Sequence, residues 1–293
     1  MSVAIIINPI SGGARPGTAE RRARIAIEAV ERHGDRPEVF ITERPGHAKD
    51  LALAAAARGM RLVIAWGGDG TINEVASALV FGDVPLAIVP AGSGNGLARE
   101  LGVSWRPARA IASALAAESR VVDVGEIAGR YFVNIAGIGF DAEVAERFNR
   151  PENTTRGLRG YAMLTARSFL TYRAREYCVT AGPQQVRIRA LMIVIANGTE
   201  FGNRILIARG ARVDDGMLDV VIVEDRSLAG TLARIPWLVA RQIHRVPQWS
   251  MRPARRVTIE CDEPMIFHVD GEPVTGATRL DARIHPGALR VCV

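Results

Sequence analysis

Three glycine-rich turns, each between an expected strand and an expected helix, have the composition of anion-binding sites. They cover residues 8–13, 67–71 and 92–96. Glycine lets the backbone approach a phosphate closely, and a helix that begins there offers free N–H groups and the positive end of its dipole. A single glycine-rich turn would be weak evidence, because glycines are also common in turns that bind nothing. Three in one parallel sheet meet at the carboxyl edge of the strands, where open α/β sheets bind ligands, so we predict a phosphate site there.

The turns differ from the two commonest nucleotide-binding motifs. The sequence has no G-x-x-x-x-G-K-[ST], and its one lysine, Lys49, lies elsewhere, which excludes a Walker-type nucleotide triphosphatase. No G-x-G-x-x-G follows the first expected strand, and the glycines of residues 92–96 have a different spacing. A standard NAD(P)-binding fold is therefore disfavoured.

Two carboxylate-containing turns suggest cation chemistry. Asp69 lies inside the second glycine turn, where phosphates would repel it unless a divalent cation or a donor network intervened. We predict that Asp69 organises a magnesium–nucleotide complex; the alternative is a turn aspartate that binds its own backbone. Asp214 and Asp215 precede a glycine, and such a turn can hold a hard cation or be ordinary turn chemistry.

The first 120 residues must position these turns. Apolar periodicity predicts strands at residues 3–8, 38–42, 61–66 and 85–89, and helices at 19–32, 47–58 and 71–79. This βαβ rhythm predicts a parallel sheet with helices on both faces. At the start of the third helix, Thr71 and Glu74 are predicted to form a capping box.

After residue 120 the pattern changes to a run of strands. They are expected at 121–127, 131–136, 176–180, 186–196, 218–224, 256–261, 265–269 and 289–293, with helices at 158–172 and 228–244. Many strands with few helices predict a second domain built on antiparallel sheet, with the boundary near residues 120–125.

Composition limits the class of protein. The chain has 293 residues, of which 48% are hydrophobic and 23% charged, which excludes disordered, collagen-like and coiled-coil proteins. No run approaches the roughly 18–20 apolar residues of a membrane span, and the first residues read as a strand, not a signal peptide. Three widely spaced cysteines predict reduced, mostly buried thiols. The net charge is +6, and nearly all basic residues are arginines. This charge favours anionic partners; the alternative is that a biased genome composition produced the arginine excess.

The sequence GGDGTINE at residues 67–74 closely resembles the GGDGTxNE motif of the diacylglycerol kinase catalytic-domain family, which includes bacterial soluble lipid kinases, sphingosine kinases and ceramide kinases. Other segments are similar to further motifs of that family in the same order. They are NPISGG at 8–13, Thr42 with PGHA at 45–48, PAGSGN at 90–95, N-x-x-G-x-G-F-D at 134–141, DDGMLD at 214–219 and DGE at 270–272.

The resemblance implies an α/β plus β fold with two domains. Residues 1–122, joined by a returning C-terminal strand at 285–293, would form a Rossmann-like α/β domain that binds ATP and is similar to those of NAD kinases and phosphofructokinases. Residues 123–284 would form a β-sandwich that supplies the lipid acceptor. The active site would lie in the interdomain cleft.

The resemblance also implies ATP and Mg²⁺ as cofactors, with Glu272 and Asp69 as catalytic residues. Glu272 would take the proton of an alcohol as its oxygen attacks the γ-phosphorus; its residue type alone equally suits an exposed hairpin. A second, structural Mg²⁺ would lie at Asp215 with the carbonyls of Arg212 and Met217, and Asp123 would join a network near the first metal. Nucleotide contacts would come from Asn8, Pro9, Ser11, Gly12, Thr42, Gly67, Gly68, Asp69, Gly70, Thr71, Asn73 and Ser93.

Ser93 departs from the family, which usually has threonine at this position. Serine keeps the hydroxyl, so the contact is retained in principle, but the packing of the missing methyl group is lost.

The expected function is that of an ATP-dependent lipid kinase of phospholipid biosynthesis, which phosphorylates diacylglycerol to phosphatidic acid. The alternatives are a kinase for a sphingoid base, phosphatidylglycerol or a polyprenyl alcohol, an NAD kinase-like enzyme, and a non-catalytic nucleotide-binding membrane regulator. Nucleic acid is not an expected partner, because four tryptophans and four tyrosines provide few stacking platforms and no recognition motif is visible.

We expect a cytoplasmic protein, peripheral to the inner face of the membrane and associated with anionic phospholipid; a homodimer is left open. Residues 228–244, with Trp237, suit contact with a membrane surface, because the apolar face could enter lipid while arginines bind phosphates. The alternative is a core-packing helix. Further aromatic and basic residues near the acceptor are Tyr161, Phe169, Tyr172, Trp249, Arg252, Arg255 and Arg256.

Overall fold

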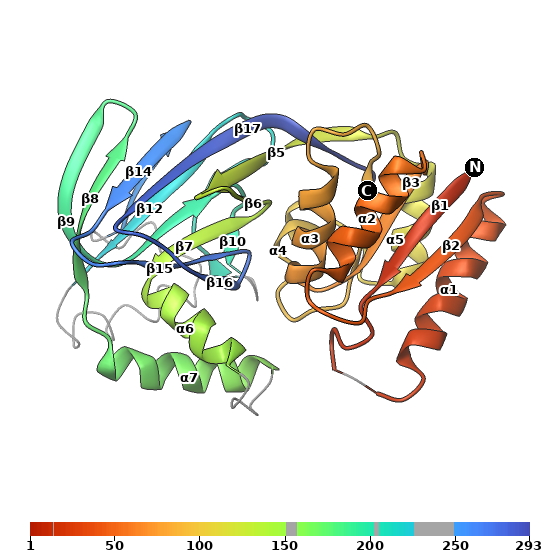
Figure 1. Cartoon of the computed structure of the whole chain (residues 1–293), viewed down its shortest axis with the longest axis horizontal. Helices are drawn as coiled ribbons and strands as arrows, with labels where there is room; N and C mark the ends of the chain where they lie inside the picture. The colour runs from red at the N-terminus through yellow and green to blue at the C-terminus, as the bar shows by residue number, and fades with distance from the viewer. Residues whose placement is uncertain (14, 151–156, 202–204, 226–248) are drawn as a thin grey trace. The chain divides into compact units, whose positions relative to one another are not determined.

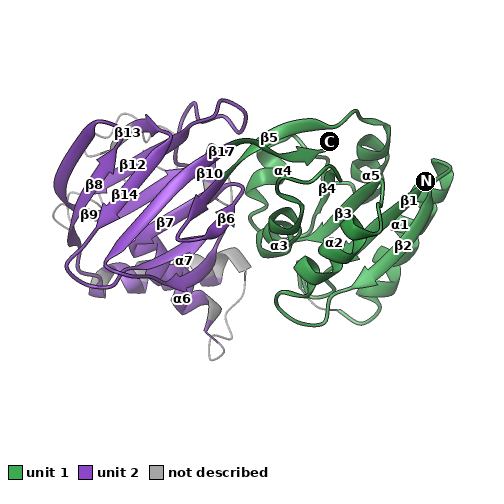
Figure 2. Ribbon diagram, turned by 45° about the horizontal axis from the view of Figure 1, so that its top comes forward, with its two compact units in different colours: residues 1–124, 286–293 green, residues 125–285 purple. Residues whose placement is uncertain are grey.

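The computed structural model describes residues 1–13, 15–150, 157–201, 205–225 and 249–293. The chain divides into two compact units, coloured separately in Figure 2. The first unit contains Met1–Val124 and Pro286–Val293, and the second contains Gly125–His285. The limits expected from the sequence are 122/123 and 284/285.

The first unit alternates strands and helices, and the elements up to residue 90 follow the predicted order, whereas the helix at Pro107–Ala116 is absent from the prediction. Its elements are β1 (Ser2–Ile7), α1 (Thr18–Arg32), β2 (Arg36–Ile41), α2 (His47–Ala57), β3 (Leu62–Gly67), α3 (Asp69–Leu79), β4 (Leu86–Pro90), α4 (Gly96–Glu100), α5 (Pro107–Ala116) and β5 (Arg120–Ile127), of which β5 continues into the second unit. Figure 1 labels all of them except β4, which Figure 2 labels.

The strands of the first unit form a parallel sheet in the order β2-β1-β3-β4. Alternate residues of a strand point to opposite faces, and β1 is apolar on both. Val3, Ile5 and Ile7 belong to a buried cluster with α1 and α5. Ala4 and Ile6 are equally buried on the other face, where α2 contacts β1 and α3 contacts β3. The predicted parallel sheet with helices on both faces is confirmed.

The predicted capping box at α3 is wrong. The helix begins at Asp69, two residues earlier than expected, and no side chain caps it. Thr71 Oγ1 accepts a hydrogen bond from Asn8 instead. The carboxylate of Glu74 accepts the N–H groups of Gly46 (2.8 Å) and Ala48 (3.0 Å). Glu74 therefore binds backbone groups at the start of α2, the helix that packs against α3.

The second unit is dominated by antiparallel strands, as predicted. Its elements are β6 (Arg130–Phe132), β7 (Ile135–Gly139), α6 (Phe140–Asn149), α7 (Gly157–Thr171), β8 (Arg175–Ala181), β9 (Gln184–Ala196), β10 (Glu200–Phe201), β11 (Ile205–Leu206), β12 (Leu218–Glu224), β13 (Trp249–Ala254), β14 (Arg256–Glu260), β15 (Ile266–Val269), β16 (Glu272–Thr275) and β17 (Arg279–Val291).

Most of these strands share one large apolar cluster, and a second, smaller cluster includes Ile135 of β7, Val194 of β9 and Val221 of β12. The first half of β9 pairs with β8, and the second half pairs with both β7 and β12. Inward-facing residues of these strands and of β14, β15 and β17 form one apolar cluster that includes the fully buried Tyr177, Phe132 and Phe267. Helices α6 and α7 contact each other, and α6 contacts β15 and β16.

The single strand predicted at 131–136 is two strands. The backbone N–H groups of Val133, Asn134 and Ile135 all donate to the carboxylate of Asp270, at 2.8, 3.0 and 2.9 Å. Because these groups are used by a side chain, the strand is interrupted between β6 and β7. The helix predicted at 228–244, with Trp237, lies outside the described residues.

Strand β17 connects distant parts of the sequence. Its first residues pair antiparallel with β14, and Val291 near its end pairs parallel with Leu86 of β4. Among the helices in the described part of the chain, none is long and apolar enough to cross a membrane. The three cysteines are free thiols: Cys292 is buried and Cys178 and Cys261 are half-buried.

Candidate active site

The three glycine-rich turns of the first unit meet at the carboxyl ends of β1, β3 and β4. Asn8, after β1, donates from Nδ2 to Thr71 Oγ1 at 2.9 Å. Asp69, after β3, accepts the backbone N–H of Asn95 at 2.7 Å and that of Gly96 at 2.8 Å. Side-chain hydrogen bonds therefore join the second turn to each of the other two.

Glycine is required where these turns touch. A Cβ atom on Gly92 would lie 2.7 Å from the Cα of Gly68. One on Gly12, whose φ is +74°, would lie 2.4 Å from the carbonyl oxygen of Ala91. Real Cβ atoms do not approach other atoms so closely, so only glycine lets the backbones of these turns pack together and leave their N–H groups near one another.

The Asp69 carboxylate holds the turn that follows β4. Burial raises the pKa of Asp69, while the two N–H bonds from Asn95 and Gly96 act in the opposite direction. Asn95 is fully buried in the left-handed conformation, with φ of 54°, and directly precedes helix α4. Asp69 thus binds the backbone of a neighbouring turn. Its predicted place beside a magnesium ion stays a prediction.

Arg22, which is not among the predicted site residues, holds the first turn in place. Its guanidinium is buried and donates to Asn8 O (2.6 Å), Ser11 Oγ (2.9 Å) and Ser11 O (2.7 Å). Burial lowers the pKa of Arg22, and the charge of Arg21 adds to that effect. The available signal was periodicity, because Arg22 lies four residues before Ala26 on the buried face of α1.

The other predicted nucleotide residues lie on or beside these turns. Ser93 is exposed, and Pro9, Thr42, Gly70 and Asn73 are half-buried. The N–H of Thr42 donates to Ile7 O at 2.9 Å, which places it beside the end of β1. A Cβ atom on Gly67 would overlap Thr71.

In the second unit, the D-G-E segment forms a two-residue β-hairpin. Val269 of β15 pairs with Glu272 of β16, and both central residues have positive φ, 48° at Asp270 and 90° at Gly271. This is the geometry for which Asp-Gly is favoured. The Asp270 side chain accepts the backbone N–H groups of residues 133–135 and so fixes the hairpin to that segment. Glu272 is the first residue of β16 and is exposed.

The predicted cation residues have hydrogen-bonding roles of their own. Asp215 is exposed and accepts the N–H of Met217 at 3.0 Å, while Arg212 donates to Asp214 at 3.1 Å. The pKa of the nearby Asp219 is raised by burial and by the charge of Asp215.

Asp123 is buried in the first unit and accepts the N–H of Gly287 at 2.7 Å, so it ties β5 to β17. Within the described residues, no group of three or more His, Cys, Asp or Glu could hold a metal ion. Both predicted metal sites stay predictions.

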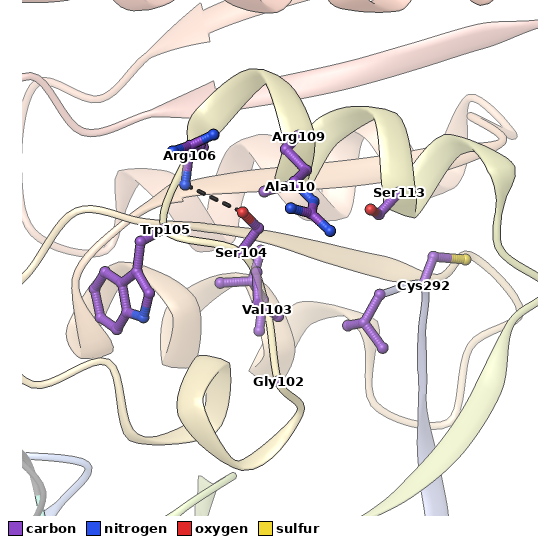
Figure 3. A pocket seen from close by; sticks show the side chains of 11 residues that line it. Gly102, Val103, Ser104, Trp105, Arg106, Arg109, Ala110, Ser113 and Cys292 are labelled. Atoms are coloured by element: carbon purple, nitrogen blue, oxygen red, sulfur yellow. Dashed lines mark hydrogen bonds between the residues drawn. The ribbon is translucent and has the colours of Figure 1, made fainter.

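A pocket of about 590 Å³ lies elsewhere in the first unit, between β4, the turn after α4 and helix α5. Figure 3 shows Trp105, Arg106 and Arg109 along it, with the N–H of Arg106 bonded to Ser104 Oγ at 3.2 Å. None of the predicted site residues lines this pocket.

Comparison with known families matches both units. Residues 2–127 match the diacylglycerol kinase catalytic domain, and residues 134–293 match the YegS C-terminal NAD kinase beta sandwich-like domain. The second description agrees with the β-sandwich expected from the sequence.

Similar proteins align over nearly the whole chain. A Pseudomonas aeruginosa protein named "Probable lipid kinase YegS-like" is 32% identical and aligns with 95% of this chain and 91% of its own length. A Mycobacterium tuberculosis protein named "Diacylglycerol kinase" is 28% identical, over 99% of this chain and 94% of its own. The crystal structure of a "putative diacylglycerol kinase" from Bacillus anthracis str. Sterne has a TM-score of 0.82 at 23% identity, covers 99% and 94% of the two chains, and thus shares the fold.

Proposed function

Since the chain belongs to the diacylglycerol kinase catalytic-domain family and is a lipid kinase, we propose that it transfers the γ-phosphoryl group of ATP to the hydroxyl of diacylglycerol, giving phosphatidic acid. One observation carries the proposal: the hydrogen bonds of Asn8 and Asp69 join the three glycine-rich turns at one edge of the parallel sheet. Phosphate-binding turns belong at this edge.

The proposed reaction draws on groups from both units. The turns of the first unit would hold the triphosphate through backbone N–H groups, which stabilise negative charge without changing protonation. Glu272 of the second unit would accept the proton of the lipid hydroxyl as its oxygen attacks the γ-phosphorus. The predicted location of the active site between the domains stays a prediction.

The residues around Asp69 fit a nucleotide-bound Mg²⁺. Such an ion keeps several waters and needs only one or two protein carboxylates besides the phosphates. The Asp69 carboxylate accepts the backbone N–H groups of Asn95 and Gly96 and a further hydrogen bond from its own backbone. A carboxylate has about four lone-pair positions, so about one position is left for a cation. When bound, the ion would neutralise charge on the phosphates.

The decisive experiment is a lipid panel. Purified protein is incubated with radiolabelled ATP, Mg²⁺ and, in separate mixed micelles, diacylglycerol, sphingosine, phosphatidylglycerol or undecaprenol, with NAD as a soluble acceptor. We expect label in phosphatidic acid. Glu272→Gln should lower kcat by about 10²-fold to 10⁴-fold, because it removes the proton acceptor. The control is Glu118→Gln, which removes an exposed carboxylate from the first unit.

The outcomes separate the alternatives. Label in another lipid would change the acceptor and leave the kinase, whereas label in NAD alone would replace the lipid acceptor. Nucleotide binding without any labelled product would favour a regulator. Equal turnover by wild type and Glu272→Gln would remove Glu272 from its role.

We also propose that the protein collects its acceptor at the surface of anionic membranes. The net charge of +6 supports this proposal, because arginines attract acidic phospholipid headgroups. Sedimentation with phosphatidylglycerol vesicles tests it, and binding that does not rise with the anionic fraction would contradict it.

A further inference from the structure

A buried histidine lies directly behind the D-G-E hairpin. His268 belongs to β15, and only 3% of it is exposed. Its Nε2 lies 3.2 Å from Oδ2 of Asp141, a residue of α6 that is itself 6% exposed. On the other side of the ring, Nδ1 lies 3.3 Å from the N–H of Gly271, the residue before Glu272. A hydrogen-bonded chain therefore leads from Asp141 to the backbone beside Glu272.

The partners determine where the proton of the ring lies. A backbone N–H can only donate, so Nδ1 must present its lone pair to Gly271. In the neutral ring the proton is then on Nε2, and it is donated to the Asp141 carboxylate. Asp141 also accepts the N–H of Ala142 at its other oxygen, Oδ1, at 2.9 Å. The carboxylate thus fixes the tautomer that the hairpin requires.

The strand opposite His268 leaves space for this pair. Gly137 of β7 is the register partner of His268. A Cβ atom on Gly137 would lie 1.9 Å from Asp141 Oδ2 and 2.5 Å from His268 Nε2. Any larger residue at position 137 would displace one of the two side chains, so the contact between His268 and Asp141 requires glycine there.

The hairpin is held from its other side as well. Asp270 accepts three consecutive N–H groups of residues 133–135, and Gly271 adopts a φ of 90° that only glycine takes readily. One residue of the turn is therefore fixed by its side chain, and the next is fixed by its N–H bond to His268. Glu272 follows directly.

We propose that His268 and Asp141 are positioning residues for Glu272. Asp141 holds His268 in the tautomer with an unprotonated Nδ1, and this Nδ1 accepts the Gly271 N–H. The hairpin then presents Glu272 in a single orientation to the reacting hydroxyl. This inference rests on the proposed function, because it assumes that Glu272 accepts the proton. A displacement of about 1 Å at a reacting group can cost about 10²-fold in rate, so a loosened hairpin should lower kcat.

Three variants test the chain of bonds. His268→Asn places an amide oxygen near the position of Nδ1 and can keep the bond to Gly271, whereas His268→Gln reaches Asp141 but offers Gly271 no acceptor. Asp141→Asn must keep its amide oxygen on the Ala142 N–H, which turns its NH₂ group toward Nε2. The ring proton then moves to Nδ1 and faces the N–H of Gly271.

We expect His268→Gln and Asp141→Asn to lower kcat by about 10-fold to 100-fold, with KM for ATP unchanged and with faster hydrogen exchange at Gly271. His268→Asn should recover most of the rate. In ¹⁵N-histidine NMR spectra, Nδ1 of His268 should be unprotonated in the wild type and protonated in Asp141→Asn.

The readouts separate this inference from the proposed function. Wild-type kcat in both His268→Gln and Asp141→Asn, beside an inactive Glu272→Gln, would overturn the positioning role and leave the kinase intact. A fully active Glu272→Gln would instead overturn the function of Glu272. Should the variants fail to fold in thermal melts, the wild-type spectrum decides: a protonated Nδ1 at His268 overturns the inference, and an unprotonated one supports it.

Discussion

Arg22 is a buried cation that donates hydrogen bonds to neutral oxygens of the first glycine turn and lies over the ring of Trp66. Three of its N–H bonds go to Asn8 and Ser11. Because hydrogen bonds from a charged donor are stronger than neutral ones, Arg22 determines where this turn lies. Asn8 of this turn also donates a hydrogen bond to Thr71. Arg22 therefore influences the position of the second glycine turn as well.

We predict that Arg22→Ala loses both stability and nucleotide affinity. Removing the donors takes the guanidinium away from the half-buried carbonyl oxygens of Asn8 and Ser11, of which Asn8 O keeps a hydrogen bond from Ser11 Oγ. This loss should lower the free energy of unfolding by about 1–3 kcal/mol. KM for ATP should rise by about tenfold, equivalent to about 1.4 kcal/mol. Urea denaturation and initial-rate kinetics measure the two effects. Arg21→Ala, which removes an exposed neighbour, is the control; equal KM in the two variants would contradict the role of Arg22.

At the scale of elements, the glycine turns contact one another through their backbones. Gly12 and Gly13 are consecutive and both have positive φ, 74° and 98°. Only Gly12 faces a neighbouring turn, because a Cβ atom there would meet Ala91 O, whereas one on Gly13 would have no atom within 4 Å. A substitution at Gly13 therefore tests backbone strain alone, whereas the same substitution at Gly12 tests backbone strain together with the contact between the turns.

We predict a larger effect for Gly12→Ala than for Gly13→Ala. Each substitution forces alanine into the left-handed region, at a cost of about 1–2 kcal/mol. Gly12→Ala also pushes the first turn away from the third, which should add about 1–3 kcal/mol and raise KM for ATP. Thermal unfolding and ATP titration measure both. Indistinguishable variants would show that the turns are not in contact.

At the scale of the whole molecule, the last residues of β17 complete the first unit. Leu289 and Val291 are fully buried, although the whole second unit, Gly125–His285, lies between this segment and the rest of the first unit in the sequence. The N–H of Phe81 donates to Ala288 O at 2.7 Å, and that of Cys292 to Leu86 O at 2.9 Å. The core of the first unit therefore includes a segment that follows the second unit in the sequence.

We predict that Leu289→Ala lowers the free energy of unfolding by about 2–5 kcal/mol, because it leaves a cavity in the core of the first unit. Arg290→Ala is the matched control: its side chain is about two-fifths exposed, so the change should stay within about 0.5 kcal/mol. Denaturation in urea measures both. Equal midpoints would mean that β17 contributes little to the first unit.

The sequence by itself determined the order of elements in the first unit, the antiparallel character of the second, and the family. The reason is local: apolar periodicity, turn glycines and motif spacing are properties of neighbouring residues. The resemblance to the family also identified Asn8, Asp69 and Glu272 as candidates.

Only the tertiary structure decided which groups those residues touch. Glu74 serves α2 and not its own helix, Asp69 binds the turn after β4, and Asp270 interrupts a strand more than 130 positions away. Arg22 and His268 carry no motif, and their roles follow from burial against specific polar partners. A hydrogen bond depends on distance in space, which residue spacing along the chain does not encode for segments brought together by folding.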